Sequence, residues 1–219
     1  MAKPVLHYFP IRGRGEPIRL AFQDCRIDFE EHRVTDFASV REPWFTEGKL
    51  EFGQLPLLED EDGNHVQLGA ILRHIGRKYN LYGKNEAEMA RVDRFLEGVS
   101  DVRSAYLQLI YQDRVADEKL REFSERIGKL VPGSGALLLG IERMVERYGG
   151  PFAVLDTVSV ADYSLFDLVD NLKRIMPDID TRFPAIARWY EHMASRPNLK
   201  AYLDSNPAHR ETVNANGLG

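Results

Sequence analysis

Two glycines flank an arginine in Gly13-Arg14-Gly15, between an apolar segment and a helix-like one. In that setting a glycine-rich loop can bind the phosphates of a dinucleotide. Such a loop needs a third glycine where the helix packs on the strand, and Ile18 stands there instead. Pro10 also separates the apolar segment from the loop. The sequence therefore argues against a nucleotide site.

Residues that can bind metal ions are present, but their spacing matches no metal motif. The acidic run at 60–64 is not a calcium loop, because Gly63 comes too early and Ile71 stands where the twelfth-position glutamate is needed. The six histidines form no H-x-x-x-H or H-E-x-x-H arrangement. Cys25 has no second cysteine to pair with. We expect a solvated turn at 60–64, an inert cysteine and no metal site.

The composition excludes several classes of protein. Lys and Arg total 29 against 34 Asp and Glu, for a net charge of -5, whereas nucleic-acid binders carry a basic surplus or stripe. No run approaches the ~20 apolar residues of a membrane helix, and charged residues interrupt the N-terminal segment where a signal peptide has its apolar core. A single cysteine suits a reducing compartment. We expect a cytoplasmic protein with no nucleic-acid or membrane partner.

The apolar patterning predicts two domains, residues 1–80 and 87–219, joined by a linker at 81–86. Short strands and helices alternate in the first, in the order βαβ, ββ, α, with a hairpin across the acidic turn. The segments expected there are strands at 5–9 and 29–34, the hairpin strands at 56–59 and 65–67, and helices at 16–23 and 70–79.

The second domain is predicted to be all helical. Apolar residues recur at intervals of three and four from Val92 to Ile110, which indicates a long amphipathic helix. Ser159, with Asp162 three residues later, resembles a capping box in which aspartate replaces the usual glutamate or glutamine. The tail at 214–219 is polar and contains glycine, so we expect it to be mobile.

Tyr8 alone would be an ordinary aromatic residue of the first strand, but its neighbours suggest another role. Residues 8–19 resemble the opening of the cytosolic glutathione transferases, where a tyrosine ending the first strand faces a glycine-flanked arginine. Phe-Gly-Gln-Leu-Pro at 52–56 resembles the family segment that holds a cis-proline. Further segments match in the same order: 67 with 70–74, 158–163, 196–203 and 214–217. The resemblance is closest to the pi class and covers essentially the whole chain. It implies an α/β thioredoxin-like N-terminal domain and an all-α C-terminal domain.

The resemblance implies an enzyme that uses glutathione as co-substrate, with no other cofactor, and conjugates it to small apolar electrophiles. Tyr8 would be catalytic: a free thiol with a pKa of about 8.5 is only about 3% ionised at pH 7, and a hydrogen bond from the phenol favours the thiolate. The residues implied to bind glutathione are Arg14, Trp44, Lys49, Gln54, Leu55, Pro56, Gln67, Leu68 and Asp101. The electrophile pocket would be lined by Phe9, Ile11, Leu107 and Tyr111.

The resemblance also implies a homodimer. Asp101 would reach the γ-glutamyl amine from the neighbouring subunit, and Phe52 matches the aromatic residue that family members insert between helices of the partner. Trp44 and Lys49 would bind the glycine carboxylate, although they lie closer in sequence to Gln54 than in the family.

Leu68 departs from the family, which carries Ser or Thr there to bind the γ-glutamyl carboxylate. Losing one charge-assisted hydrogen bond costs ~1.5–3 kcal/mol, or about 10- to 150-fold in affinity. Two alternatives to conjugation stay open, and Leu68 favours the first of them. One is a non-catalytic ligand-binding or structural relative, and the other is an isomerase or peroxidase that uses the same glutathione thiolate.

Overall fold

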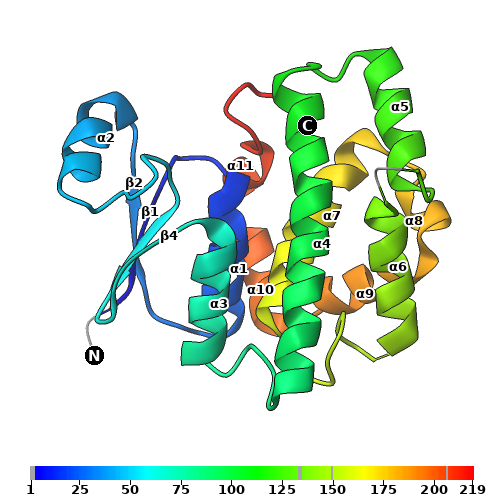
Figure 1. Cartoon of the computed structure of the whole chain (residues 1–219), viewed down its shortest axis with the longest axis horizontal. Coiled ribbons are helices and arrows are strands. Elements are labelled where there is room, and N and C mark those ends of the chain that lie inside the picture. The colour runs from blue at the N-terminus through cyan, green and yellow to red at the C-terminus, as the bar shows by residue number, and fades with distance from the viewer. Residues whose placement is uncertain (1–2, 133–134, 149, 206) are drawn as a thin grey trace.

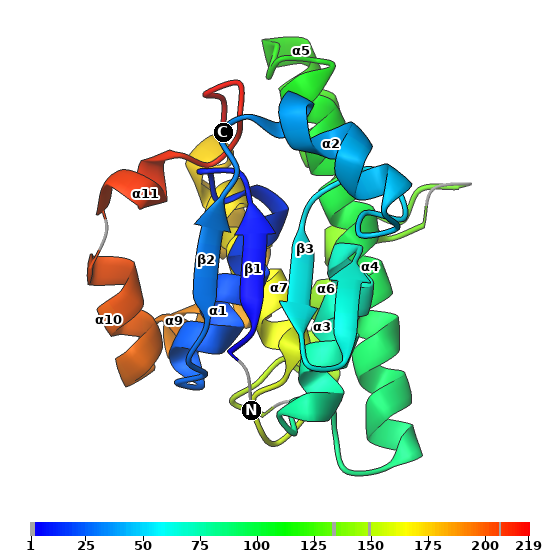
Figure 2. The same ribbon diagram turned by 90° about the vertical axis from the view of Figure 1, so that its left-hand side faces the viewer.

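The computed structural model describes residues 3–132, 135–148, 150–205 and 207–219. The N-terminal half of the structure contains a four-stranded sheet. Its strands are β1 (Val5–Tyr8), β2 (Glu30–Arg33), β3 (Leu57–Asp60) and β4 (Gly63–Val66), in the spatial order β2-β1-β3-β4. β1 and β2 are parallel, whereas β3 is antiparallel to both β1 and β4 (Figure 2). The four predicted strands are thus all present, in the predicted order along the chain.

Two helices lie between this sheet and the rest of the molecule (Figure 1). The short helix η1 (Gly13–Gly15) leads into α1 (Glu16–Asp24), which supplies the crossover that parallel β1 and β2 require. The other helix, α3 (Leu68–Lys78), follows β4 and buries its apolar side chains Ile71, Leu72 and Ile75. The N-terminal end of α1 follows β1, and that of α3 follows β4. The sheet therefore fixes the positions of these two helix ends.

Helix α2 (Phe37–Thr46) was not predicted from the sequence. It contains Pro43 and buries none of its residues, so the apolar periodicity that reveals a helix is missing. Its local signal is at the start, where the Asp36 carboxylate accepts a hydrogen bond from the Ser39 amide at 3.2 Å. The helix stands on the side of the sheet away from α1 and α3 (Figure 1).

The C-terminal half is helical, as predicted. Its helices are α4 (Glu86–Tyr111), α5 (Asp117–Ile127), α6 (Leu137–Tyr148), α7 (Val160–Ile175), α8 (Ile179–Arg182), α9 (Pro184–Ala194), α10 (Pro197–Ser205) and α11 (Pro207–Glu211). Helix α7 forms the centre and packs against both α1 and α4, so one apolar core is continuous through the two halves. Among the helices of the described residues, none has the length and apolar character needed to cross a membrane.

The capping box at the start of α7 forms with aspartate in the third position. The Ser159 amide donates to the Asp162 carboxylate at 2.8 Å. That carboxylate also accepts from the Ala153 amide at 2.7 Å and from the Trp189 indole at 2.9 Å. Burial raises the pKa of Asp162, against these hydrogen bonds. The predicted cap therefore also joins α7 to α9.

The tail at 214–219 is held in place, so the expectation of mobility was wrong. The Asn214 side chain donates to the Tyr106 hydroxyl at 2.8 Å and to the Leu218 carbonyl at 2.7 Å. The Asn216 side chain donates to the Ile110 carbonyl at 2.9 Å. Local composition gave no sign of these partners, because those on α4 lie more than a hundred residues away in the sequence.

Candidate active site

Tyr8 ends β1 with its side chain buried against the loop that follows. A Cβ atom on Gly13 would lie 2.5 Å from the Tyr8 hydroxyl oxygen, and one on Gly15 would lie 2.5 Å from the ring carbon Cδ1. Gly13 also has a φ of 42°, a conformation that favours glycine. The two glycines therefore leave space for the Tyr8 ring, which accounts for the Gly-Arg-Gly sequence without a nucleotide.

The Tyr8 hydroxyl oxygen accepts a hydrogen bond from the Arg14 backbone amide at 2.7 Å. A phenol carries one hydrogen and two acceptor positions, so this contact fixes the oxygen and leaves the hydrogen available for donation. Burial raises the pKa of Tyr8, while the Arg14 amide and the Arg19 guanidinium oppose that rise. The phenol is therefore protonated at neutral pH and able to donate to a bound anion.

The loop that carries Arg14 is anchored by Arg12, a residue that the sequence analysis did not single out. Its fully buried guanidinium pairs with Asp167 at 3.0 Å and with Asp170 at 2.7 Å, both on α7. The backbone amides of Arg12 and Gly13 donate to the carbonyls of residues 212 and 213 at 2.8 and 3.0 Å. No sequence signal reveals these partners, because they lie more than 150 positions away.

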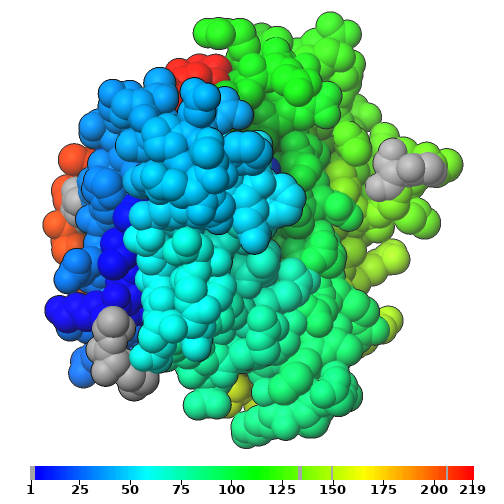
Figure 3. Space-filling view, turned by 60° about the vertical axis from the view of Figure 1, so that its left-hand side comes forward, coloured from blue at the N-terminus to red at the C-terminus, as the bar shows by residue number. Residues whose placement is uncertain are grey.

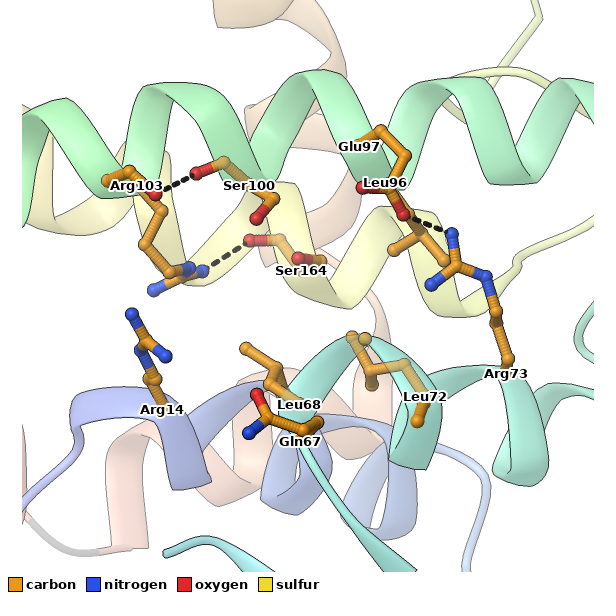
Figure 4. Close-up of a pocket in the computed structure, with 13 residues that line it drawn as sticks. Arg14, Gln67, Leu68, Leu72, Arg73, Leu96, Glu97, Ser100, Arg103 and Ser164 are labelled. Carbon is orange, nitrogen blue, oxygen red and sulfur yellow. Dashed lines mark hydrogen bonds and ion pairs between the residues drawn. The ribbon is translucent and has the colours of Figure 1, made fainter. Parts of the chain in front are cut away.

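A cavity of about 280 Å³ lies between the N-terminal end of α3 and the middle of α4 (Figure 4). We call it the α3–α4 cavity; it is lined by Arg14, Gln67, Leu68, Leu96, Ser100 and Arg103, with others. In Figure 4 Arg14 and Leu68 point toward α4, and Arg103 faces them. Three of the residues predicted for glutathione binding are therefore neighbours in one cavity: Arg14, Gln67 and Leu68.

Gln67 adopts a backbone conformation that is rare for residues other than glycine. Its φ is 68° and its ψ is 117° at the position just before α3. Strained conformations of this kind are often found at functional sites. The Gln67 side chain is exposed, while Leu68 is half-buried against the core.

Two of the three arginines that line the cavity pair with acidic side chains. Arg73 pairs with Asp93 and Glu97. Arg103 pairs with Asp167 at 2.7 Å. Within the described ranges, the Arg14 guanidinium forms no ion pair. It is therefore the cation available to an anionic ligand in the α3–α4 cavity.

The predicted residues of the 44–56 segment lie near the end of β1. The Lys49 ammonium is 4.6 Å from the centre of the Trp44 ring, and it also pairs with Glu59 at 2.6 Å. Pairing of His7 with Leu57 in the sheet brings Pro56 beside Tyr8, and the Leu55–Pro56 bond is cis. Gln54, just before it, is exposed.

The remaining predicted residues lie outside the α3–α4 cavity. The Phe9 ring packs edge-on against the Tyr8 ring at 5.4 Å between centres. Tyr111 is 45% exposed and near enough to Tyr8 to affect its pKa, and its hydroxyl accepts from the Ala215 amide at 3.2 Å. Two more, Ile11 and Leu107, are half-buried, and Asp101 is exposed on α4. Figure 3 shows a hollow between the blue and cyan N-terminal half and the green residues of α4.

Two family models match the chain. Residues 4–77 match the glutathione S-transferase N-terminal domain, and residues 100–206 match the glutathione S-transferase C-terminal domain. Together these matches cover most of both halves of the structure.

Relatives with the same family name match over nearly their full length. A Caenorhabditis elegans protein named Glutathione S-transferase P 10 is 40% identical, with 98% of this chain and 97% of that protein covered. Glutathione S-transferase P of Capra hircus is 33% identical, with 99% of each chain covered.

A solved structure also matches the whole chain. The pi-class glutathione S-transferase of Onchocerca volvulus is 36% identical, aligns over 100% of both chains and gives a TM-score of 0.84. The fold class and the resemblance that the sequence predicts are thus both confirmed. The chain belongs to the glutathione S-transferase family and is a transferase.

Proposed function

We propose that the protein conjugates glutathione to small apolar electrophiles, with Tyr8 as the catalytic residue. The observation that carries the proposal is the hydrogen bond from the Arg14 amide to the Tyr8 hydroxyl oxygen, which leaves the phenol hydrogen free to stabilise a thiolate. Phe9, Ile11, Leu107 and Tyr111 are proposed to form the electrophile pocket.

Glutathione is proposed to bind along the end of β1 and into the α3–α4 cavity. Its γ-glutamyl end would lie in the cavity, against Arg14, Gln67 and the backbone amide of Leu68. Gln54, Leu55 and Pro56 would hold the cysteinyl part, and the thiol would then lie beside Tyr8, because the strand register sets Pro56 next to Tyr8. Trp44 and the Lys49 ammonium that lies over its ring would bind the glycine carboxylate. That carboxylate would compete with Glu59 for the Lys49 ammonium.

A homodimer is proposed from the apolar surface around α2. Phe52 is 61% exposed and Phe45 is 56% exposed, and both line a surface cavity of about 470 Å³. Exposed aromatic pairs of this kind are typical of interface anchors. Asp101 would then act on the glutathione bound to the partner. Domain limits of 1–80 and 87–219 are also proposed, since α3 ends at Lys78 and α4 begins at Glu86. A cytoplasmic location and a detoxifying role are proposed from the family resemblance.

A non-catalytic ligand-binding role is the second candidate, because Leu68 presents an apolar side chain to the cavity where the family has a hydroxyl. The test is a calorimetric titration with glutathione, followed by turnover assays with a general electrophile, a peroxide and an isomerisable substrate. Saturable binding with conjugation is expected. Glutathione binding without turnover would support the second candidate, and turnover with the other substrates alone would support isomerase or peroxidase activity. An absence of glutathione binding would contradict every glutathione-dependent role.

A further inference from the structure

Three metal-ligating side chains meet on the far end of the sheet from Tyr8, although they are scattered in the sequence. Asp60 ends β3, His65 lies on β4 and His74 lies on α3. Their ligand atoms are all within 4.8 Å of one another. The β3–β4 hairpin returns His65 beside Asp60, and α3 then passes over both, which is why no local spacing motif revealed the cluster.

The two imidazoles meet at the Asp60 carboxylate. The Nε2 atom of His65 lies 3.1 Å from one oxygen of the Asp60 carboxylate, and the Nε2 atom of His74 lies 2.7 Å from the other. The two rings stack with 3.7 Å between their centres and 20° between their planes. The two Nε2 atoms thus approach the two oxygens of one carboxylate from the same side of the stacked pair. The ligand atoms around a tetrahedral zinc ion are about 3.3 Å apart, and the two distances between Nε2 and carboxylate oxygen, 3.1 and 2.7 Å, are close to that value.

The three side chains are protected but still reachable. The Asp60 side chain is 2% exposed, that of His65 21% and that of His74 15%. A fourth ligand is also close, since the Asp62 carboxylate lies 3.9 Å from the Nε2 atom of His74. Two imidazoles and carboxylate oxygens form a ligand set preferred by zinc and similar divalent ions.

Lys78 is the group that opposes metal binding. Its ammonium lies 3.1 Å from Asp60, 3.1 Å from Glu61 and 2.7 Å from Asp62. A metal ion bound to Asp60 would repel this charge, and Glu61, which is not among the proposed ligands, offers it another position. The Lys78 ammonium and a cation from solution would therefore compete for the Asp60 carboxylate.

We propose that Asp60, His65 and His74 form a binding site for a divalent transition-metal ion of the zinc type. The site joins β3, β4 and α3 on either side of the Gln67–Leu68 turn, so the bound ion stabilises the fold around that turn. It is separate from the proposed transferase chemistry, which needs no metal.

The test is a calorimetric titration of the chelator-treated protein with Zn²⁺, together with its melting temperature with and without Zn²⁺. One ion is expected to bind and to raise the melting temperature. His65→Gln and His74→Gln should each weaken binding about tenfold or more, and Lys78→Met should tighten it about tenfold by removing the competing charge. His192→Gln changes an exposed histidine elsewhere and serves as the matched control, with no change expected.

The signs of these effects separate a metal site from a network of hydrogen bonds. Without a metal site, Lys78→Met would only remove ion pairs, and Zn²⁺ would bind no more tightly than before. The proposal is overturned if neither the wild type nor Lys78→Met binds Zn²⁺, or if His65→Gln and His74→Gln bind it as His192→Gln does. Circular dichroism identifies any variant that fails to fold, and the other histidine variant then decides the result.

Discussion

Leu68 occupies the first position of α3, where it lines the cavity beside Arg14 and Gln67. Leu68→Ser should tighten glutathione binding roughly tenfold, because the new hydroxyl can donate to the proposed γ-glutamyl carboxylate. Calorimetry and the melting temperature, measured on the same samples, check this. If Leu68 instead mainly fills space, the variant loses ~1–3 kcal/mol of stability with no gain in affinity. Unchanged or weaker binding by a well-folded variant would defeat the idea that the missing hydroxyl limits the site.

Glu16 provides a pH test at the same scale. Burial opposes its ionisation, but hydrogen bonding to His209 and the charges of Arg19 and Arg12 outweigh this and lower the pKa of Glu16 to about 2. A carboxyl whose pKa is lowered by folding contributes stability above its unfolded pKa of about 4.3, and this is lost as the pH falls toward the folded value.

Wild-type protein should therefore exceed Glu16→Gln in stability at about pH 6, and the difference should shrink at about pH 3. Denaturant unfolding at both values measures it. A difference that stays constant between them would show that Glu16 does not titrate in this way.

The Tyr8 side chain leaves no room for a side chain at either glycine of η1 without a shift. Gly15→Ala places a methyl group against the Tyr8 ring, so either the ring or the loop must shift. We expect a stability loss of about 1–3 kcal/mol and reduced turnover. In Gly140→Ala, on α6, the new Cβ has 3.9 Å to its nearest neighbour, and this variant is the matched control. It should be neutral or up to about 1 kcal/mol more stable. Equal behaviour of the two variants would contradict the close fit around Tyr8.

The elements predicted correctly are those whose side chains carry a periodic or local signal. The apolar repeat from Val92 to Ile110 identifies α4, and Ser159 with Asp162 identifies the start of α7. Helix α2 lacks a buried face, so periodicity could not reveal it. The partners of Arg12 and of Asn214 lie beyond any local pattern, because the fold alone brings them together. The site was predicted only because its residues resemble those of a known family. Tyr8 considered alone indicates no more than an aromatic residue of a strand.

For the whole molecule, the proposal of a homodimer rests on Phe52. Phe52→Ala should weaken the dimer by ~2 kcal/mol or more, because a buried aromatic anchor would be lost. Leu130 is 68% exposed outside this surface, so Leu130→Ala is the control and should leave the dimer intact. Sedimentation over a range of concentrations measures both. A wild-type monomer at micromolar concentration would contradict the dimer and would remove Asp101 from the proposed site.

The central claim is that the Tyr8 hydroxyl stabilises the thiolate of bound glutathione. Its most direct test is an absorbance titration of the thiolate in the binary complex, comparing wild type with Tyr8→Phe. The wild type should lower the thiol pKa from about 8.5 to about 6.5, whereas the variant should leave it near 8.5 with glutathione affinity within a few-fold of wild type. The same thiol pKa in both complexes would contradict the account.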